Sequence, residues 1–86
     1  MAIKVKKIST IYDVMVPEES VEYSDIYYDS ADAFDYIRKD ILKRVERFQS
    51  LGGSIETDMD SYVSWSVDPN GDDSGLVEYK IVDARD

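Results

Sequence analysis

Residues 30–51 read SADAFDYIRKDILKRVERFQSL and form the only long helical pattern in the chain. Asp29 or Ser30 can cap its first turn by accepting hydrogen bonds from free amides. Gly52 and Gly53 can end it in a left-handed conformation at little steric cost. The stretch predicts one amphipathic helix, because its apolar side chains recur every three or four residues along one face: Phe34, Ile37, Ile41, Val45 and Phe48.

Segments typical of β-strands lie on both sides of this helix. Residues 3–16 and 21–28 precede it and are rich in β-branched and aromatic residues. A proline opens residues 17–20 between them, which predicts a turn. Residues 55–67 and 76–82 follow the helix. The short connections predict two antiparallel hairpins, one before the helix and one after it.

The first strand segment changes its apolar parity. Ile3 and Val5 occupy odd positions, whereas Ile8, Tyr12, Val14 and Val16 occupy even ones. A regular strand keeps its apolar side chains on one face. We therefore expect a bulge or a register break near Lys6 and Lys7, or two short strands in place of one.

The segment after the helix shows the clearest alternation. Residues 55–67 place apolar side chains mainly at odd positions and polar ones mainly at even positions, which predicts one long strand with a buried and a wet face. Asp68 to Gly75 contains a proline, an Asn-Gly pair and a second glycine, and predicts a turn. In the returning strand, Val77, Tyr79 and Ile81 should face the core.

The element order is therefore two strands, a helix and two strands, in a single domain over residues 1–86. It predicts an α+β fold in which one helix packs on one face of a four-stranded antiparallel sheet. The other face of the sheet is then open to solvent.

Composition limits the function. The formal net charge is −9, and the chain has neither cysteine nor histidine. Such acidity disfavours direct binding to nucleic acids or anionic membranes and favours a basic protein partner. There is no apolar run long enough to cross a membrane and no secretory signal pattern, and the lack of cysteine fits a cytoplasmic protein.

No motif indicates catalysis or a cofactor. The segment from Asp68 to Asp73 has oxygen ligands at alternate positions, but Asp73 and Tyr79 stand where a calcium loop needs glycine and glutamate. The carboxylates of the third strand segment lie on a flat strand without sign of a pocket that could shift a pKa. We expect no catalytic residue, metal ligand or cofactor.

The candidate partner-binding residues are acids and a tyrosine on the strands. Alternate residues of a strand are about 6.8 Å apart, so acids at alternate positions would form a regular negative line, similar in scale to the phosphate spacing of DNA. Such a line could occupy a basic groove, and a solvated strand face is the alternative. The predicted partner-binding residues are Glu56, Asp58, Asp60 and Tyr62, with Glu22 and Asp25.

The acid runs at Glu18-Glu19 and at Glu56, Asp58 and Asp60, in a short chain with a lone helix, make the sequence resemble small phage-encoded inhibitors of the DNA-mimic and anti-CRISPR types. This resemblance is one of general character and transfers no specific residue. It implies a non-catalytic protein that occludes a basic, nucleic-acid-binding enzyme or complex. The alternative is a homodimer that pairs through the bare sheet face or an edge strand, with acidity serving only solubility.

Overall fold

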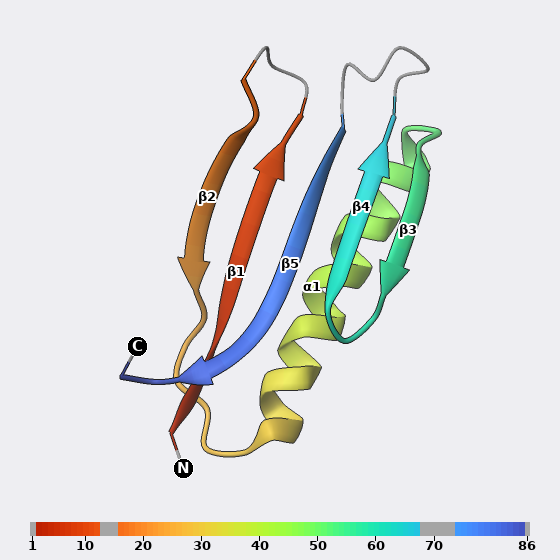
Figure 1. The fold of residues 1–86 in the computed structure, drawn as a ribbon. Helices are drawn as coiled ribbons and strands as arrows, with labels where there is room; N and C mark the ends of the chain where they lie inside the picture. Colours follow the sequence, from red (N-terminus) through yellow and green to blue (C-terminus); the bar gives the residue numbers. More distant parts are fainter. Residues whose placement is uncertain (1, 13–15, 68–73, 86) are drawn as a thin grey trace.

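A computed structural model describes residues 2–12, 16–67 and 74–85 of the chain. One helix packs on one face of an antiparallel sheet with the strand order β2-β1-β5-β4-β3 (Figure 1). The elements are β1 (Ile3–Ile11), β2 (Glu18–Tyr23), α1 (Ser30–Ser50), β3 (Ser54–Asp58), β4 (Tyr62–Ser66) and β5 (Ser74–Asp83). The predicted α+β class with one helix is therefore confirmed, whereas the predicted number of four strands is wrong.

Helix α1 begins and ends as its sequence predicts. The Asp29 side chain accepts a hydrogen bond from the amide of Ala31 at 2.8 Å. At the other end Gly52 has a φ of +79°, and the amide of Gly53 donates to the carbonyl of Phe48 at 2.9 Å. Left-handed glycine and a bond back to the last turn satisfy carbonyls that the helix leaves free.

The core lies between α1 and the nearer face of the sheet. Its largest fully buried side chains come from the middle of the helix and from strands β1, β4 and β5, and Phe48 stacks on Trp65 with ring centroids 4.4 Å apart. In β5, Val77 and Tyr79 are buried and Ile81 packs against the core, as predicted. The buried apolar residues are Ile3, Val5, Ala33, Ile37, Ile41, Phe48, Val63, Trp65, Val77 and Tyr79.

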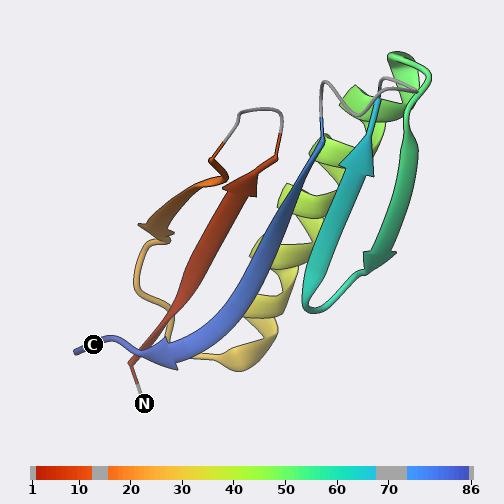
Figure 2. The same cartoon turned by 45° about the horizontal axis from the view of Figure 1, so that its top comes forward.

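The helix does not cover the whole sheet. It lies behind β5, β4 and β3, and β2 stands at the far edge of the sheet (Figures 1 and 2). All six residues of β2 are exposed. The face of the sheet opposite the helix, which we term the open face, carries no other element of the described chain.

The fifth strand arises because residues 55–67 are two strands and not one. The chain turns at residues 59–61, where the amide of Ser61 donates to the carbonyl of Asp58 and the amide of Asp60 donates to the Asp58 carboxylate, both at 3.0 Å. The register pairs Thr57 with Val63, so odd residues stay opposite odd residues. The alternation of apolar and polar residues therefore continues through the turn. The three-residue loop also contains no glycine or proline, so the sequence showed no pattern typical of a turn.

The first hairpin also differs from the prediction. Strand β1 keeps one register against both β2 and β5, without a break at Lys6-Lys7. Lys7 points into the helix side of the sheet and is only 9% exposed, while Ile8 points to the open face. The predicted turn at 17–20 is wrong at its end, because Glu18 to Ser20 already belong to β2.

Two other sequence predictions remain to be compared with the structure. The predicted strand at 21–28 begins earlier and stops at Tyr23, after which Tyr27 alone pairs with Ile3. The turn predicted at 68–75 cannot be compared in full, because residues 68–73 lie outside the described part of the chain. The same residues contain the segment that we compared with a calcium loop.

Candidate protein-binding surface

The structure brings three of the predicted partner-binding residues together on the open face. Glu56 and Asp58 lie on β3, and Asp58 pairs across the hairpin with Tyr62 of β4. Tyr62 in turn pairs with Glu78 of β5, which the sequence prediction did not include. These side chains point away from the helix, because the residues next to them, such as Val63, are buried under it.

The other three predicted residues lie elsewhere. Asp60 is in the β3–β4 turn, where its carboxylate accepts from Arg38 of the helix at 2.9 Å. Glu22 of β2 lies 3.5 Å from the ammonium of Lys7 on the helix side of the sheet. Asp25 is exposed in the connection after β2. The predicted line of charge through Glu56, Asp58 and Asp60 is thus broken, because the chain reverses before Asp60.

Acids line both edge strands of the sheet. Glu18, Glu19 and Glu22 lie on β2, and Glu56 and Asp58 lie on β3. An edge strand exposes unpaired backbone groups, and charged side chains along it prevent association with another strand. Part of the acidity therefore has a structural explanation.

A half-buried ionic cluster ties the helix to the sheet. The Asp40 carboxylate accepts hydrogen bonds from the Tyr79 hydroxyl and from Arg44, the latter at 3.2 Å, and lies 3.9 Å from the ammonium of Lys7. Burial by itself would raise the pKa of Asp40, but the Tyr79 hydrogen bond and the charges of Lys7 and Arg44 outweigh it and hold the pKa below its usual value. Because each group already has its partner, we interpret the cluster as structural.

Acids and tyrosines gather where the chain passes from β2 into α1. Tyr28 is 76% exposed, and Ile26 beside it is 52% exposed. An exposed aromatic among carboxylates is typical of binding surfaces, where tyrosine provides a large contact area at a small entropic cost. We term this surface the acidic end; it consists of Asp25, Tyr27, Tyr28, Asp29, Asp32, Asp35 and Tyr36.

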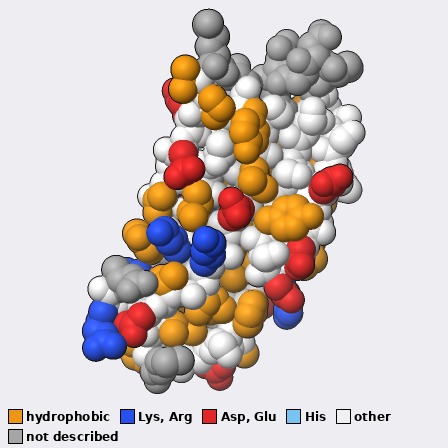
Figure 3. Space-filling view, viewed as in Figure 1, with side chains coloured by type: hydrophobic (Ala, Val, Ile, Leu, Met, Phe, Trp, Pro, Cys, Tyr) orange, Lys and Arg blue, Asp and Glu red, His pale blue; other side chains and the backbone are white. Residues whose placement is uncertain are grey.

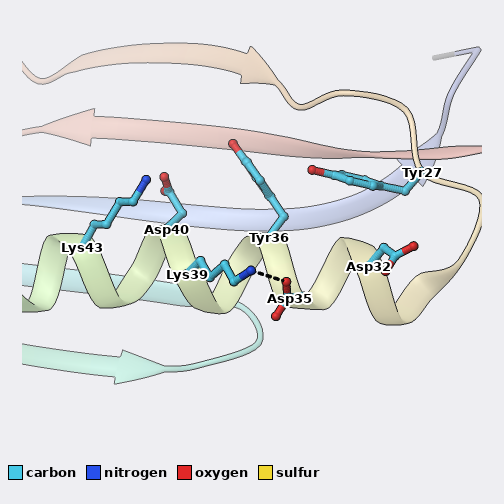
Figure 4. Close-up of a pocket in the computed structure, with 7 residues that line it drawn as sticks. All are labelled: Tyr27, Asp32, Asp35, Tyr36, Lys39, Asp40 and Lys43. Carbon is cyan, nitrogen blue, oxygen red and sulfur yellow. Dashed lines mark ion pairs between the residues drawn. The ribbon is translucent and has the colours of Figure 1, made fainter.

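The acidic end contains a hollow of about 350 Å³ on the helix side of the molecule (Figure 4). Tyr27 reaches it from the connection and Tyr36 from the helix, with ring centroids 6.1 Å apart and an angle of 42° between the rings. Lys39 pairs with Asp35 at its rim, at 2.9 Å. The lining residues are Tyr27, Asp32, Asp35, Tyr36, Lys39, Asp40 and Lys43.

Both signs of charge line this hollow, because Lys39 and Lys43 lie there together with Asp32, Asp35 and Asp40. Burial raises the pKa of the Tyr27 hydroxyl, and the carboxylates of Asp25, Asp32 and Asp35 raise it further because they disfavour a second negative charge nearby. Aromatic faces also attract lysine and arginine side chains through their quadrupole. Asp32 is the one lining carboxylate without an ion pair to a described base, so it and the two tyrosine rings could receive one basic side chain of a partner protein.

Sequence reasoning selected only Asp25 from this surface. Residues 8–37 contain acidic residues but no lysine or arginine. This run is the sequence feature that pointed to the acidic end. The convergence of the two tyrosines was not visible, because it depends on two backbone hydrogen bonds between Tyr27 and Ile3, at 2.7 and 2.8 Å. These bonds join segments far apart in the chain and place Tyr27 beside the helix.

Within residues 2–12, 16–67 and 74–85, no three acidic side chains are grouped so that they could hold a metal ion. In the same part of the chain, α1 is too polar to cross a membrane.

Comparison with known proteins identifies no relative. The sequence matches no protein-family model, and neither a curated protein nor a solved structure resembles it at a significant level.

Proposed function

We propose that this chain is a non-catalytic interaction protein that docks its acidic end on a basic protein and inhibits that protein by occlusion. The partner class that fits best is an enzyme or complex whose basic surface binds nucleic acid. The observation that carries the proposal is the exposed Tyr28, which stands in the chain between Asp29 and Tyr27, one of the residues that line the hollow.

The charge balance of the described residues supports this proposal. Five of the fourteen acidic residues in the described ranges form an ion pair with a described base, which leaves nine without one. Asp25, Asp29 and Asp32 of the acidic end are among the nine. Such a field steers a basic partner into contact and speeds association, and added salt weakens it.

Contact energies at such surfaces concentrate on a few residues. Tyrosine and arginine are, with tryptophan, the residue types enriched at binding hot spots. Tyr28 would provide the aromatic anchor, and the hollow between Tyr27 and Tyr36 would receive an arginine or lysine of the partner. Carboxylates around them would occupy the positions of phosphate groups on the partner's surface.

The test is an affinity capture from a bacterial lysate at low and raised salt, with proteins identified by mass spectrometry. We expect one basic, nucleic-acid-binding protein that is lost at raised salt, and whose nucleic-acid binding the purified chain inhibits. The variant D25N/D32N/Y28A should fail to capture it. If this variant captures the same protein as strongly as the wild type, the acidic end is not the binding surface.

The matched control is E56Q/D58N, which removes the same number of charges from the open face of β3. The asparagine that D58N introduces keeps a side-chain oxygen able to accept from the turn amide, as the Asp58 carboxylate does. Normal capture by the control supports the acidic end. Loss of capture by the control alone would instead support the strand surface that the sequence predicted.

A further inference from the structure

Strand β2 forms an edge of the sheet that the described chain leaves uncovered. It pairs with β1 on one side only, and all six of its residues are exposed. The helix does not extend over it (Figure 2). An exposed edge can pair with a further strand, because every second residue directs its amide and carbonyl away from the sheet.

The register shows which backbone groups of β2 face outward. The amide of Ser24, directly after the strand, donates to the carbonyl of Val5 on β1 at 3.0 Å. In an antiparallel pair, the backbone groups of every second residue turn to the same neighbour. Even-numbered residues of β2 therefore turn toward β1, and the amides and carbonyls of Glu19, Val21 and Tyr23 point to the free edge.

Two of these residues expose apolar side chains on the open face. Val21 and Tyr23 are 45% and 49% exposed, although an antiparallel sheet normally places polar residues on its wet face. Figure 3 shows exposed apolar side chains on this face with charged ones among them. On β3, the other edge strand, the open face carries only Ser54, Glu56 and Asp58. Strand β2 is therefore the edge at which an added strand would bury apolar surface.

The negative charge of β2 is unbalanced at the beginning of the strand. Glu18 and Glu19 form no ion pair with a base of residues 2–12, 16–67 and 74–85. Their partners in the β1 register are Ile11 and Thr10, which carry no charge. Opposite charges on neighbouring strands stabilise a sheet. An added strand is therefore favoured when it brings lysine or arginine next to these two glutamates.

Bases of the chain itself balance the other end of β2. Lys7 lies 3.5 Å from Glu22, and Lys4 lies 4.2 Å from the ring centroid of Tyr23. Lys6 is directly opposite Tyr23 in the register. Residues of an added strand at this end should therefore be apolar or uncharged, because a base there would meet like charge.

We infer that β2 accepts an extended segment of a basic protein as an added antiparallel strand. All strand pairs of the sheet are antiparallel, and this pairing is slightly more stable per residue than the parallel one. In such strand addition, main-chain hydrogen bonds provide affinity and alternate side chains provide specificity. The segment places lysine or arginine beside Glu18 and Glu19, and apolar residues beside Val21 and Tyr23.

A second copy of this chain is a poorer occupant of the edge. It would bring the glutamates of its own β2, or Glu56 and Asp58 of its β3, next to the acids already there. The inference does not depend on the proposed function, because it concerns the edge of the sheet and not the acidic end.

The probe is a short synthetic peptide with capped ends, Val-Thr-Val-Thr-Lys-Arg. In antiparallel pairing its valines lie beside Tyr23 and Val21, and its lysine and arginine lie beside Glu19 and Glu18. Titration of the peptide into the isotope-labelled chain, followed by NMR, measures the dissociation constant and identifies the amides that respond. We expect the response to centre on Glu19, Val21 and Tyr23.

Modified peptides distinguish strand addition from nonspecific charge attraction. N-methylation of the second valine blocks an amide that would face β2, whereas N-methylation of the second threonine blocks one that would face away. We expect the first change to weaken binding at least about tenfold and the second to change it less than about threefold. The reversed peptide has the same composition and charge. It should bind at least about fivefold more weakly, because its arginine would lie beside Tyr23, near Lys4 and Lys6.

Variants of the whole chain provide matched tests on the protein. E18Q/E19Q should weaken peptide binding about fivefold, because it removes the two unbalanced charges of the edge. E56Q/D58N removes the same number of charges from β3 and should change binding less than about twofold, since solvent and salt screen that distance. D25N/D32N/Y28A should also bind the peptide normally, which separates failure of the edge from failure of the acidic end. Circular dichroism verifies that each variant is folded.

Three results would overturn the inference. The first is a chain whose β2 amides do not respond to millimolar peptide. The second is equal affinity of the two N-methylated peptides, because binding would then not use the backbone of β2. The third is a concentration-dependent response of β2 without peptide, which would make a second copy the occupant of the edge.

Discussion

Replacing Asp40 with asparagine tests whether the ionic cluster anchors the helix to the sheet. The D40N variant keeps the shape of the side chain and an oxygen that can accept from Tyr79. It removes the charge that faces Lys7 and Arg44. The Lys7 side chain is 11% exposed, so its ammonium would lose a close counter-charge in a poorly solvated position.

The magnitude follows from burial. Breaking a fully buried ion pair costs about 3–5 kcal/mol, and a hydrogen bond to a charged group contributes about 1.5–3 kcal/mol. The Asp40 side chain is 20% exposed and Lys7 keeps Glu22 at 3.5 Å, which reduces the loss. We expect the free energy of unfolding to fall by about 2–3 kcal/mol, which is roughly 10–20 °C in Tm for a domain of this size.

Urea denaturation of D40N and of D35N at neutral pH measures this difference. Asp35 is the matched control, because it lies on the same helix and pairs with Lys39, yet both side chains are more than half exposed. An exposed pair contributes little, so D35N should cost less than about 0.5 kcal/mol. Equal losses for the two variants would refute the anchoring role.

The pH dependence of the free energy of unfolding provides a second test of the same role. The pKa of Asp40 is lower in the folded state than in the unfolded chain. Its stabilisation is therefore complete above the unfolded value of about 3.9 and is lost as the pH falls through the folded value. The stability gap between wild type and D40N should narrow in acid; a gap that stays constant would contradict the assignment.

Three further predictions concern packing and titration. I41A should lower the free energy of unfolding by about 2–5 kcal/mol in urea titrations, since Ile41 is fully buried, whereas L42A on the exposed side should change it little. G75A should cost about 1–3 kcal/mol in the same assay, because an added methyl would lie 2.5 Å from the Trp65 ring. Unchanged stability would show that the ring can move. In a spectrophotometric titration with Y27F as reference, Tyr27 should ionise above the ordinary tyrosine pKa, because burial and nearby carboxylates raise it; D32N should bring that pKa down, and an ordinary value in the wild type would contradict the negative field of the hollow.

Much of the fold could be predicted because its signals are local. Capping by Asp29, the apolar stripe of the helix and the glycines after it all act within a few residues. Residues 77–81 alternate apolar and charged side chains because a strand buried on one face has a period of two. The acidity of the connection before the helix is likewise readable from composition.

The turn after β3 was hidden from sequence patterns. Its loop is held by the Asp58 side chain and by the ion pair of Asp60 with Arg38, which comes from another element. Because the register preserves parity, one strand and two strands have the same alternation. Only tertiary contacts distinguish them, and they moved Asp60 away from Glu56 and Asp58.

The sequence by itself determined the helix, the strand character of its neighbours and the excess of negative charge, since each depends on residue type and local spacing. The tertiary structure decided which charges meet. It buried Lys7 by supplying Asp40 and Glu22 from elements distant in sequence. It also set Lys6 against Lys80 and left β2 beyond the helix. The order of the strands and the pairing of distant side chains arise from long-range packing. No periodic pattern within a single stretch of sequence reports that packing.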